Sequence, residues 1–150
     1  MTNQKFYLIT GLFFQEDTAL GIGMDPQIGE RATIQKVIKH ALFSGVIDTQ
    51  SNVGALQDHY GTSNLIIKEL KDDSIEFIKT YDRQGHSFTY HFFKNDDGEY
   101  IGYWENKKMK MRGLARCTIK GIDPTEFFQY KDIPEKLKKF TSKHLEEFED

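Results

Sequence analysis

The sequence has one cysteine, three prolines and no long apolar run among its 150 residues. Cys117 has no second cysteine to pair with, which is typical of proteins from a reducing compartment. No segment approaches the roughly 20 apolar residues that a transmembrane helix needs. The apolar stretch 6–14 is weakly similar to a secretion signal, but Glu16, Asp17 and the missing small-residue cleavage site argue against one. We therefore expect a cytoplasmic protein without a membrane partner.

An excess of basic charge is also missing, because the formal net charge is -3 and the pI is about 6.0. Nucleic-acid binders usually carry such an excess, since phosphate contacts dominate their affinity. We therefore expect no nucleic-acid partner. Gly21, Gly23 and Gly29 lack the spacing and the following lysine of a phosphate-binding loop. The five histidines lack metal-site spacing, so neither a cofactor nor a metal is predicted. No nucleophile with a neighbouring base is apparent. The sequence therefore leaves an enzymatic activity undecided, but it favours a protein without one.

Aromatic residues, in contrast, are abundant, with twelve Phe, seven Tyr and one Trp. Large rings can therefore supply much of the buried area. The chain length is typical of one domain, and no linker divides it. The prolines at 26, 124 and 134 fall outside every segment that we predict as a strand, as ladder hydrogen bonding requires. We predict a single domain over 1–150, with a barrel at about 5–121 and a C-terminal helix at about 132–148.

The second half of the chain predicts an antiparallel meander. Five segments have the alternating pattern of strands: 63–71, 74–82, 86–94, 99–105 and 111–121. Short turns separate them, among them Asp97-Gly98, and links this short force neighbouring strands to be antiparallel. Apolar residues occupy both faces of the segments, for example Ile78, Phe93 and Ile101 opposite the aromatic face. A sheet that is apolar on both faces must be covered on both. We therefore expect a mainly β fold, either a closed barrel with a partly apolar outside or a sheet with a docked helix.

The remaining segments give less uniform predictions. Residues 5–15 and 52–58 are predicted strands, whereas 32–43 fits a helical stripe that stops at Ser44-Gly45, with a strand as the alternative. At the C-terminus, Asp132 can cap a helix and Pro134 suits its first turn. The apolar stripe of this helix consists of Ile133, Leu137, Phe140, Leu145 and Phe148. We expect this stripe to dock on the barrel wall or on a second copy, which would make a homodimer.

Several short runs carry a resemblance to a known family. They include Asp58-His59-Tyr60-Gly61-Thr62-Ser63, Gly98-Glu99-Tyr100-Ile101-Gly102-Tyr103-Trp104 and Gly113-Leu114-Ala115. Over about residues 52–121 the chain resembles small bacterial lipocalin-like proteins of the calycin type of up-and-down β-barrel. The resemblance implies a closed barrel. It implies little about activity, because such barrels include ligand carriers, enzymes and proteins of other roles.

One set of aromatic and cationic residues is the best candidate for a binding site: Phe77, Lys79, Tyr81, Tyr90, Trp104 and Arg116. Rings on an inner strand face would give apolar contacts, and Lys79 or Arg116 could neutralise a carboxylate or phosphate. The leading function is therefore non-catalytic binding of a small apolar or anionic ligand inside the barrel. The alternatives are a filled interior, and a protein-interaction module that acts through the C-terminal helix or a sheet edge.

Trp104, a member of this set, and Cys117, next to Arg116, have predicted structural roles. Trp104 is expected to be buried, with Gly102 leaving room for a neighbouring ring. Arg116 could lower the pKa of the Cys117 thiol, but adjacent residues of a regular strand point to opposite faces. Cys117 is therefore interpreted as a small core residue.

Overall fold

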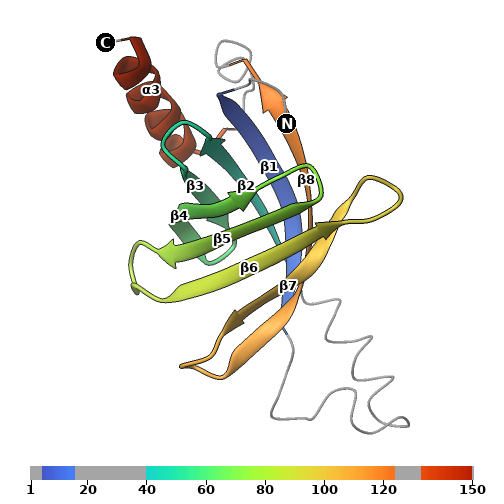
Figure 1. The fold of residues 1–150 in the computed structure, drawn as a ribbon. Helices are drawn as coiled ribbons and strands as arrows, with labels where there is room; N and C mark the ends of the chain where they lie inside the picture. The colour runs from blue at the N-terminus through green and yellow to red at the C-terminus, as the bar shows by residue number, and fades with distance from the viewer. Residues whose placement is uncertain (1–4, 16–39, 124–132, 150) are drawn as a thin grey trace, which may run out of the picture.

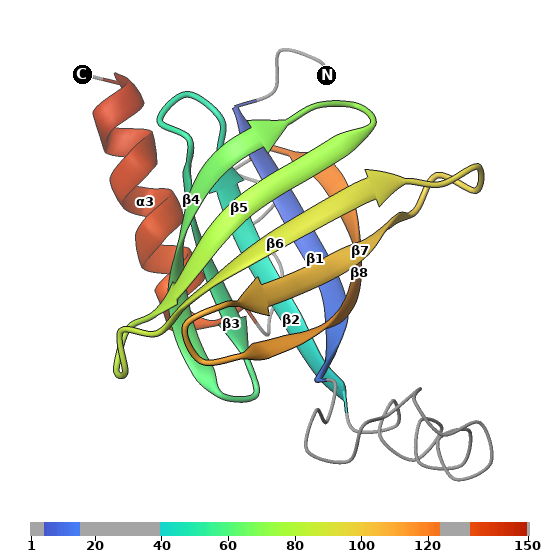
Figure 2. The same ribbon diagram turned by 60° about the horizontal axis from the view of Figure 1, so that its bottom comes forward.

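The computed structural model describes residues 5–15, 40–123 and 133–149. Eight strands form a closed barrel in which each strand is antiparallel to the next, and β8 closes on β1 (Figures 1 and 2). The strands are β1 Phe6–Gln15, β2 His40–Asp48, β3 Val53–Asp58, β4 Gly61–Leu70, β5 Ser74–Tyr81, β6 Ser87–Lys94, β7 Tyr100–Asn106 and β8 Met111–Ile122. Within these described ranges, one helix, α3 Glu135–Glu149, lies against the outside. The mainly β fold with a C-terminal helix is confirmed.

The meander predicted for residues 63–121 is confirmed, with strand bounds within two residues of those expected. The turn between β6 and β7 shows why its sequence favours a hairpin. Gly98 has a φ of 82°, a left-handed conformation that glycine adopts at little cost. The side chain of Asn95 accepts hydrogen bonds from the backbone nitrogens of Asp97 and Glu99. Local chemistry therefore fixes this register as strongly as the alternation does.

The predicted helix at 32–43 is wrong over its last four residues, because His40–Phe43 belong to β2. Residues 32–39 lie outside the described residues. Ala41 and Phe43 face the interior while Leu42 is 65% exposed, which is a period of two rather than a helical period. Gly45 does not end an element, since it lies in β2 where an added Cβ would sit 2.7 Å from the carbonyl oxygen of Ala55. Pairing with β1 and β3 overrides the weak helical pattern.

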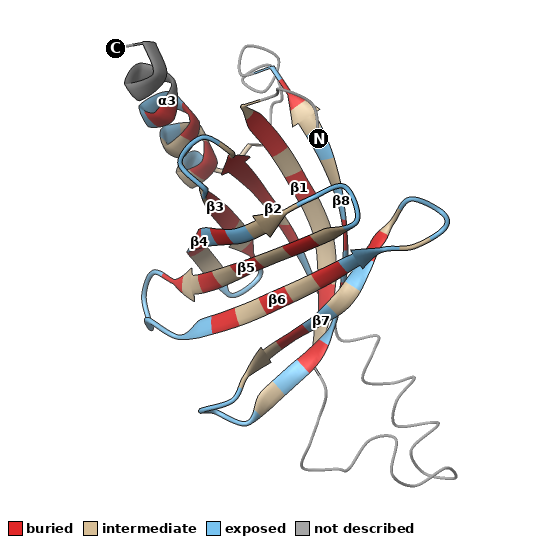
Figure 3. Ribbon diagram, in the orientation of Figure 1, coloured by how far each residue is buried: buried red, intermediate tan, exposed pale blue. Residues whose placement is uncertain are grey.

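Side chains inside the barrel fill the half that contains the β2–β3, β4–β5 and β6–β7 turns. Ile47, Leu56, Leu65 and Ile75 are each at most 1% exposed, and they pack into one large cluster with the inward aromatic residues. Buried and partly exposed positions alternate along β5, as the sequence pattern predicts (Figure 3). The other half of the barrel contains the pocket described below.

Of the two arrangements expected for a sheet that is apolar on both faces, the structure has the closed barrel with a partly apolar outside. Phe93, Ile101, Tyr103 and Leu114 are 41–60% exposed, and no described element lies over them. Phe93 is directly opposite Ile101, and Tyr103 is directly opposite Leu114, so they form one apolar outer patch on β6–β8. The helix covers a different part of the wall, over β2 and β3.

The helix docks on the barrel of its own chain, as one of the two expected arrangements. Leu137 is 1% exposed and packs with Phe6, Val46 and Ala55. Lys136 fixes the start of the helix by donating hydrogen bonds to Asp82 at 2.7 Å and to Asn64 at 2.8 Å. Asp132 and the side chains of Leu145 and Phe148 lie outside the described residues. None of the described helices is long and apolar enough to cross a membrane.

Replacing Leu137 by alanine should lower the free energy of unfolding by about 2–5 kcal/mol, because a buried side chain is removed between helix and barrel. Deleting residues 132–150 should also lower the free energy of unfolding, and it should expose the barrel wall beneath the helix. Urea denaturation and binding of a hydrophobic dye measure the two effects. Lys139→Ala, at an exposed position of the helix, is the matched control. Equal stability of Leu137→Ala and the control would show that the helix is not held by this contact.

Candidate ligand pocket at one end of the barrel

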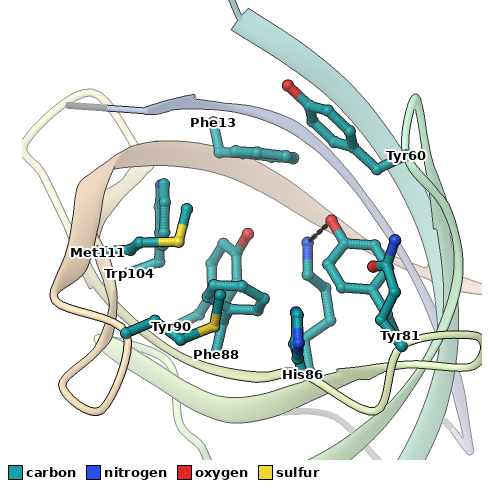
Figure 4. A pocket seen from close by; sticks show the side chains of 11 residues that line it. Phe13, Tyr60, Tyr81, His86, Phe88, Tyr90, Trp104 and Met111 are labelled. Carbon is teal, nitrogen blue, oxygen red and sulfur yellow. Dashed lines mark hydrogen bonds between the residues drawn. The ribbon is translucent and has the colours of Figure 1, made fainter. Parts of the chain in front are cut away.

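A pocket opens at the end of the barrel where the β3–β4, β5–β6 and β7–β8 turns lie. Its volume is about 210 Å³. Its walls are formed by Phe13, Tyr60, Lys79, Tyr81, Gln84, His86, Phe88, Tyr90, Trp104, Met109 and Met111 (Figure 4). A protein cavity of roughly 150 Å³ can hold benzene. The pocket therefore has room for one aromatic ring with a small substituent.

The depth of the pocket follows from the exposure of its lining. Tyr60 and Met109 are 60% and 40% exposed and lie at the mouth, whereas Tyr90 and Trp104 are 2% and 3% exposed. His86 also lies at an exposed position, in the turn that precedes β6. The barrel interior is therefore neither fully open nor fully filled. Side chains pack one half of it, and the other half contains the pocket.

Trp104 is buried as predicted, and rings surround it. Its ring centroid lies 5.5 Å from that of Phe88 and 5.9 Å from that of Phe13, both in edge-on geometry. Its indole nitrogen donates a hydrogen bond of 3.0 Å to the carbonyl oxygen of Phe14. These contacts fix the ring as one wall of the pocket.

The prediction that Gly102 leaves room for a ring is wrong. An added Cβ at Gly102 would collide with the backbone of His91, so this glycine permits a close approach of two strands. Gly113 makes the room for Trp104, since an added Cβ there would lie 2.6 Å from the indole nitrogen. Gly113 and Trp104 are directly paired across β7 and β8, a register that the sequence alone does not give.

Three polar side chains meet at the inner wall of the pocket. The Lys79 ammonium donates hydrogen bonds to Asp58 Oδ2 at 2.9 Å and to the Tyr81 hydroxyl at 2.8 Å, the second of which is dashed in Figure 4. The Tyr81 hydroxyl donates to the same Asp58 oxygen at 2.6 Å. The other Asp58 oxygen accepts a bond from the backbone nitrogen of Tyr60 at 2.8 Å. The side chains of Lys79 and Asp58 are 2% and 0% exposed, so this is a buried, paired charge.

Aromatic rings enclose the same ammonium group. Lys79 Nζ lies 4.5 Å from the ring centroid of Phe13, 4.4 Å from that of Tyr81 and 5.0 Å from that of Tyr90. Phe88 is a fourth ring, at 6.0 Å. The negative faces of aromatic rings attract a cation, and the attraction grows when water is excluded. Rings and carboxylate together offset part of the cost of burying the lysine charge in an apolar wall.

Burial changes the acid–base properties of this group of side chains. Desolvation lowers the pKa of Lys79, and the charge and hydrogen bond of Asp58 oppose that shift. Desolvation and the neighbouring Asp58 raise the pKa of Tyr81, and burial likewise raises the pKa of Tyr90. Both tyrosines therefore stay neutral hydroxyls over the range in which most proteins are stable.

Four of the six predicted site residues line the pocket: Lys79, Tyr81, Tyr90 and Trp104. Phe77 lies deeper in the barrel, stacked on Tyr90 with 5.1 Å between the ring centroids. Arg116 is not part of the site. It lies on the outer face of β8, with its side chain 49% exposed and bound to Glu99, because its neighbour in the chain, Cys117, points inward.

Sequence reasoning missed Asp58, Tyr60 and Phe13. Asp58 ends a short strand and is 21 residues from Lys79 in the sequence, so only the register of β3, β4 and β5 brings the two together. The sequence did contain a clue to this pair. A buried lysine needs a partner of opposite charge, and the alternation in β3 places Asp58 on the same inward face as Leu56.

Cys117 is an interior core residue, 3% exposed, as interpreted from the alternation. Burial raises the pKa of its thiol from 9.0 to about 12. The folded protein thus retains a proton that the unfolded chain loses above about pH 9. Because the folded pKa is the higher one, the resulting stability is complete below pH 9 and is lost between about pH 9 and 12.

Wild-type protein should lose about 2 kcal/mol more stability than Cys117→Ala between about pH 8 and pH 10.5, because only wild type carries this thiol. The tyrosines titrate in both proteins, so the difference isolates Cys117. Urea denaturation across this pH range measures it. Parallel pH profiles of the two proteins would contradict the burial of an unionised thiol.

Among the described residues, no group of three or more His, Cys, Asp or Glu side chains is placed to hold a metal ion. Comparisons of the chain with protein families, with curated proteins and with solved structures found no match. The function must therefore be inferred from the pocket itself.

Proposed function

We propose that the protein binds a small, partly apolar molecule non-catalytically inside a lipocalin-like barrel, and that the ligand is a neutral aromatic compound with one hydrogen-bond acceptor. The observation that carries this proposal is the position of Lys79 in the pocket wall. An ammonium group has three donors, and Asp58 and Tyr81 accept two of them. Among the described residues the ammonium has no third hydrogen-bond partner, so a ligand oxygen can accept the remaining donor.

Charge balance favours a neutral ligand over the anion that the sequence suggested. Asp58 already neutralises Lys79 in the wall, and Arg116 lies outside the barrel. A carboxylate ligand would therefore bring a second, unpaired negative charge into an apolar site, which is costly. A carbonyl or hydroxyl group can accept the third hydrogen bond without adding charge. The rings of Phe13, Phe88 and Trp104 then supply the apolar contacts.

Three ligands of nearly equal size separate these possibilities: toluene, benzamide and benzoate. Trp104 fluorescence and calorimetry should show benzamide binding about tenfold more tightly than toluene, because a hydrogen bond from a charged donor contributes at least about 1.5 kcal/mol. Benzoate should bind more weakly than benzamide. Tightest binding of benzoate would overturn the neutral-ligand proposal, and binding of none of the three would overturn ligand binding.

The double variant Asp58→Asn/Lys79→Met provides the matched control, because it removes both charges together. It should retain toluene binding and lose the preference for benzamide. A preference that survives in this variant would show that Lys79 does not select the ligand.

The alternative of a protein-interaction module has less support in the forms that we considered. The barrel is closed, so its eight described strands offer no free edge. The helix uses Leu137, with Phe140 and Ile133 beside it, to cover the barrel of its own chain. The apolar outer patch on β6–β8 is the remaining surface for such a role. A cytoplasmic location and the homodimer remain expectations.

A further inference from the structure

From the position of Lys79 we infer that the pocket captures small aromatic aldehydes covalently, as an imine on the Lys79 amine. This inference rests on the proposed function, since the aldehyde must first bind in the pocket. Lys79 lines the pocket, and its Nζ has a carboxylate oxygen at 2.9 Å and a phenol oxygen at 2.8 Å. An amine, a proton acceptor and a proton donor at one point of an apolar pocket are the groups that imine formation requires.

The reaction begins with proton transfer from the Lys79 ammonium to Asp58 Oδ2, which leaves a neutral amine and a carboxylic acid. The amine lone pair attacks the aldehyde carbon, and the π electrons of the carbonyl move to its oxygen. One proton then passes from nitrogen to that oxygen, which gives a neutral carbinolamine. Burial lowers the pKa of Lys79, which favours the first of these steps.

In the second half, the Asp58 acid protonates the carbinolamine hydroxyl, the carbon–oxygen bond breaks and water leaves. The nitrogen lone pair forms the carbon–nitrogen double bond. The net change is ammonium plus aldehyde to iminium plus water, so charge is conserved and no oxidant or reductant is needed. The Tyr81 hydroxyl, which contacts both Nζ and Oδ2, is placed to relay the protons.

The surroundings of Lys79 suit the product as well as the resting state. The iminium carries the same positive charge as the ammonium and would stand beside the same carboxylate. The rings of Phe13, Tyr81 and Tyr90, within 5.0 Å of Nζ, stabilise either cation. The buried wall also limits access of the water that would hydrolyse the imine.

Reduction with cyanoborohydride in the presence of benzaldehyde tests the inference on the full chain. Peptide mass mapping should locate the reduced benzyl adduct on Lys79, with about tenfold or more higher occupancy than on Lys68, because the pocket holds the carbonyl beside the amine. Lys68 is the matched control, since it lies exposed on β4. Excess benzamide should suppress labelling of Lys79 and leave Lys68 unchanged.

Lys79→Arg, which keeps the positive charge but forms no stable imine, should lose the preferred adduct. The wild-type map decides the question even if this variant folds poorly. Equal labelling of Lys79 and Lys68 while benzamide still binds would overturn imine formation alone. Equal labelling together with no benzamide binding would overturn the proposed function as well.

Discussion

Replacing Asp58 by alanine is expected to lower the free energy of unfolding by about 3–5 kcal/mol, because it leaves the buried Lys79 ammonium without its counter-charge. Lys79 is 1% exposed overall, and its pairing oxygen also accepts the hydroxyl of Tyr81. Alanine therefore leaves one charge and one hydroxyl donor unpaired in the barrel wall. Urea denaturation at neutral pH measures the loss.

A double-mutant cycle with Lys79→Met identifies the cause of that loss. The double variant should cost clearly less than the sum of the two single variants, since neither charge is then left alone. Glu99→Ala is the control, because its ion pair with Arg116 is exposed and should contribute about 1 kcal/mol or less. Additive effects in the Asp58–Lys79 cycle would show that the two groups do not form a coupled buried pair.

Replacing Trp104 by alanine should cost about 3–5 kcal/mol, because it removes the largest ring from the barrel interior. The indole contacts Phe13 and Phe88 and hydrogen-bonds to β1, so its loss opens the wall that supports the pocket. Tyr103→Ala is the matched control, one residue away and 41% exposed on the outer face. Equal losses for the two variants would contradict the assigned faces of β7, as would native emission typical of a hydrated indole.

The sequence predicted the barrel best where alternation and turn chemistry agree. In β5, the residues Ile75, Phe77, Lys79 and Tyr81 all point inward, as their spacing of two indicates. The hairpin at Asp97-Gly98 was likewise predictable from residues that favour tight turns. Both signals are local, so a single chain is enough to detect them.

The sequence was a poorer guide where contacts depend on distant register. The region 40–43 has apolar residues that fit a helix as well as a strand, and pairing with β1 decides between them. The Asp58–Lys79 pair depends on two successive hairpins in the correct register. Phe13 reaches the pocket from β1, which is next to β8 because the barrel closes. The closure of the barrel was predicted, but the residue contacts that closure creates between β1 and the other strands were not.

Methionine-methyl NMR during a benzamide titration tests the central proposal most directly, because it shows where the ligand sits. Met109 and Met111 lie at the pocket, at the β7–β8 turn. Their resonances should shift and saturate together with the change in Trp104 fluorescence, and benzoate at equal concentration should give smaller shifts. Unchanged Met109 and Met111 signals at benzamide concentrations that saturate the Trp104 fluorescence change would contradict binding inside the barrel.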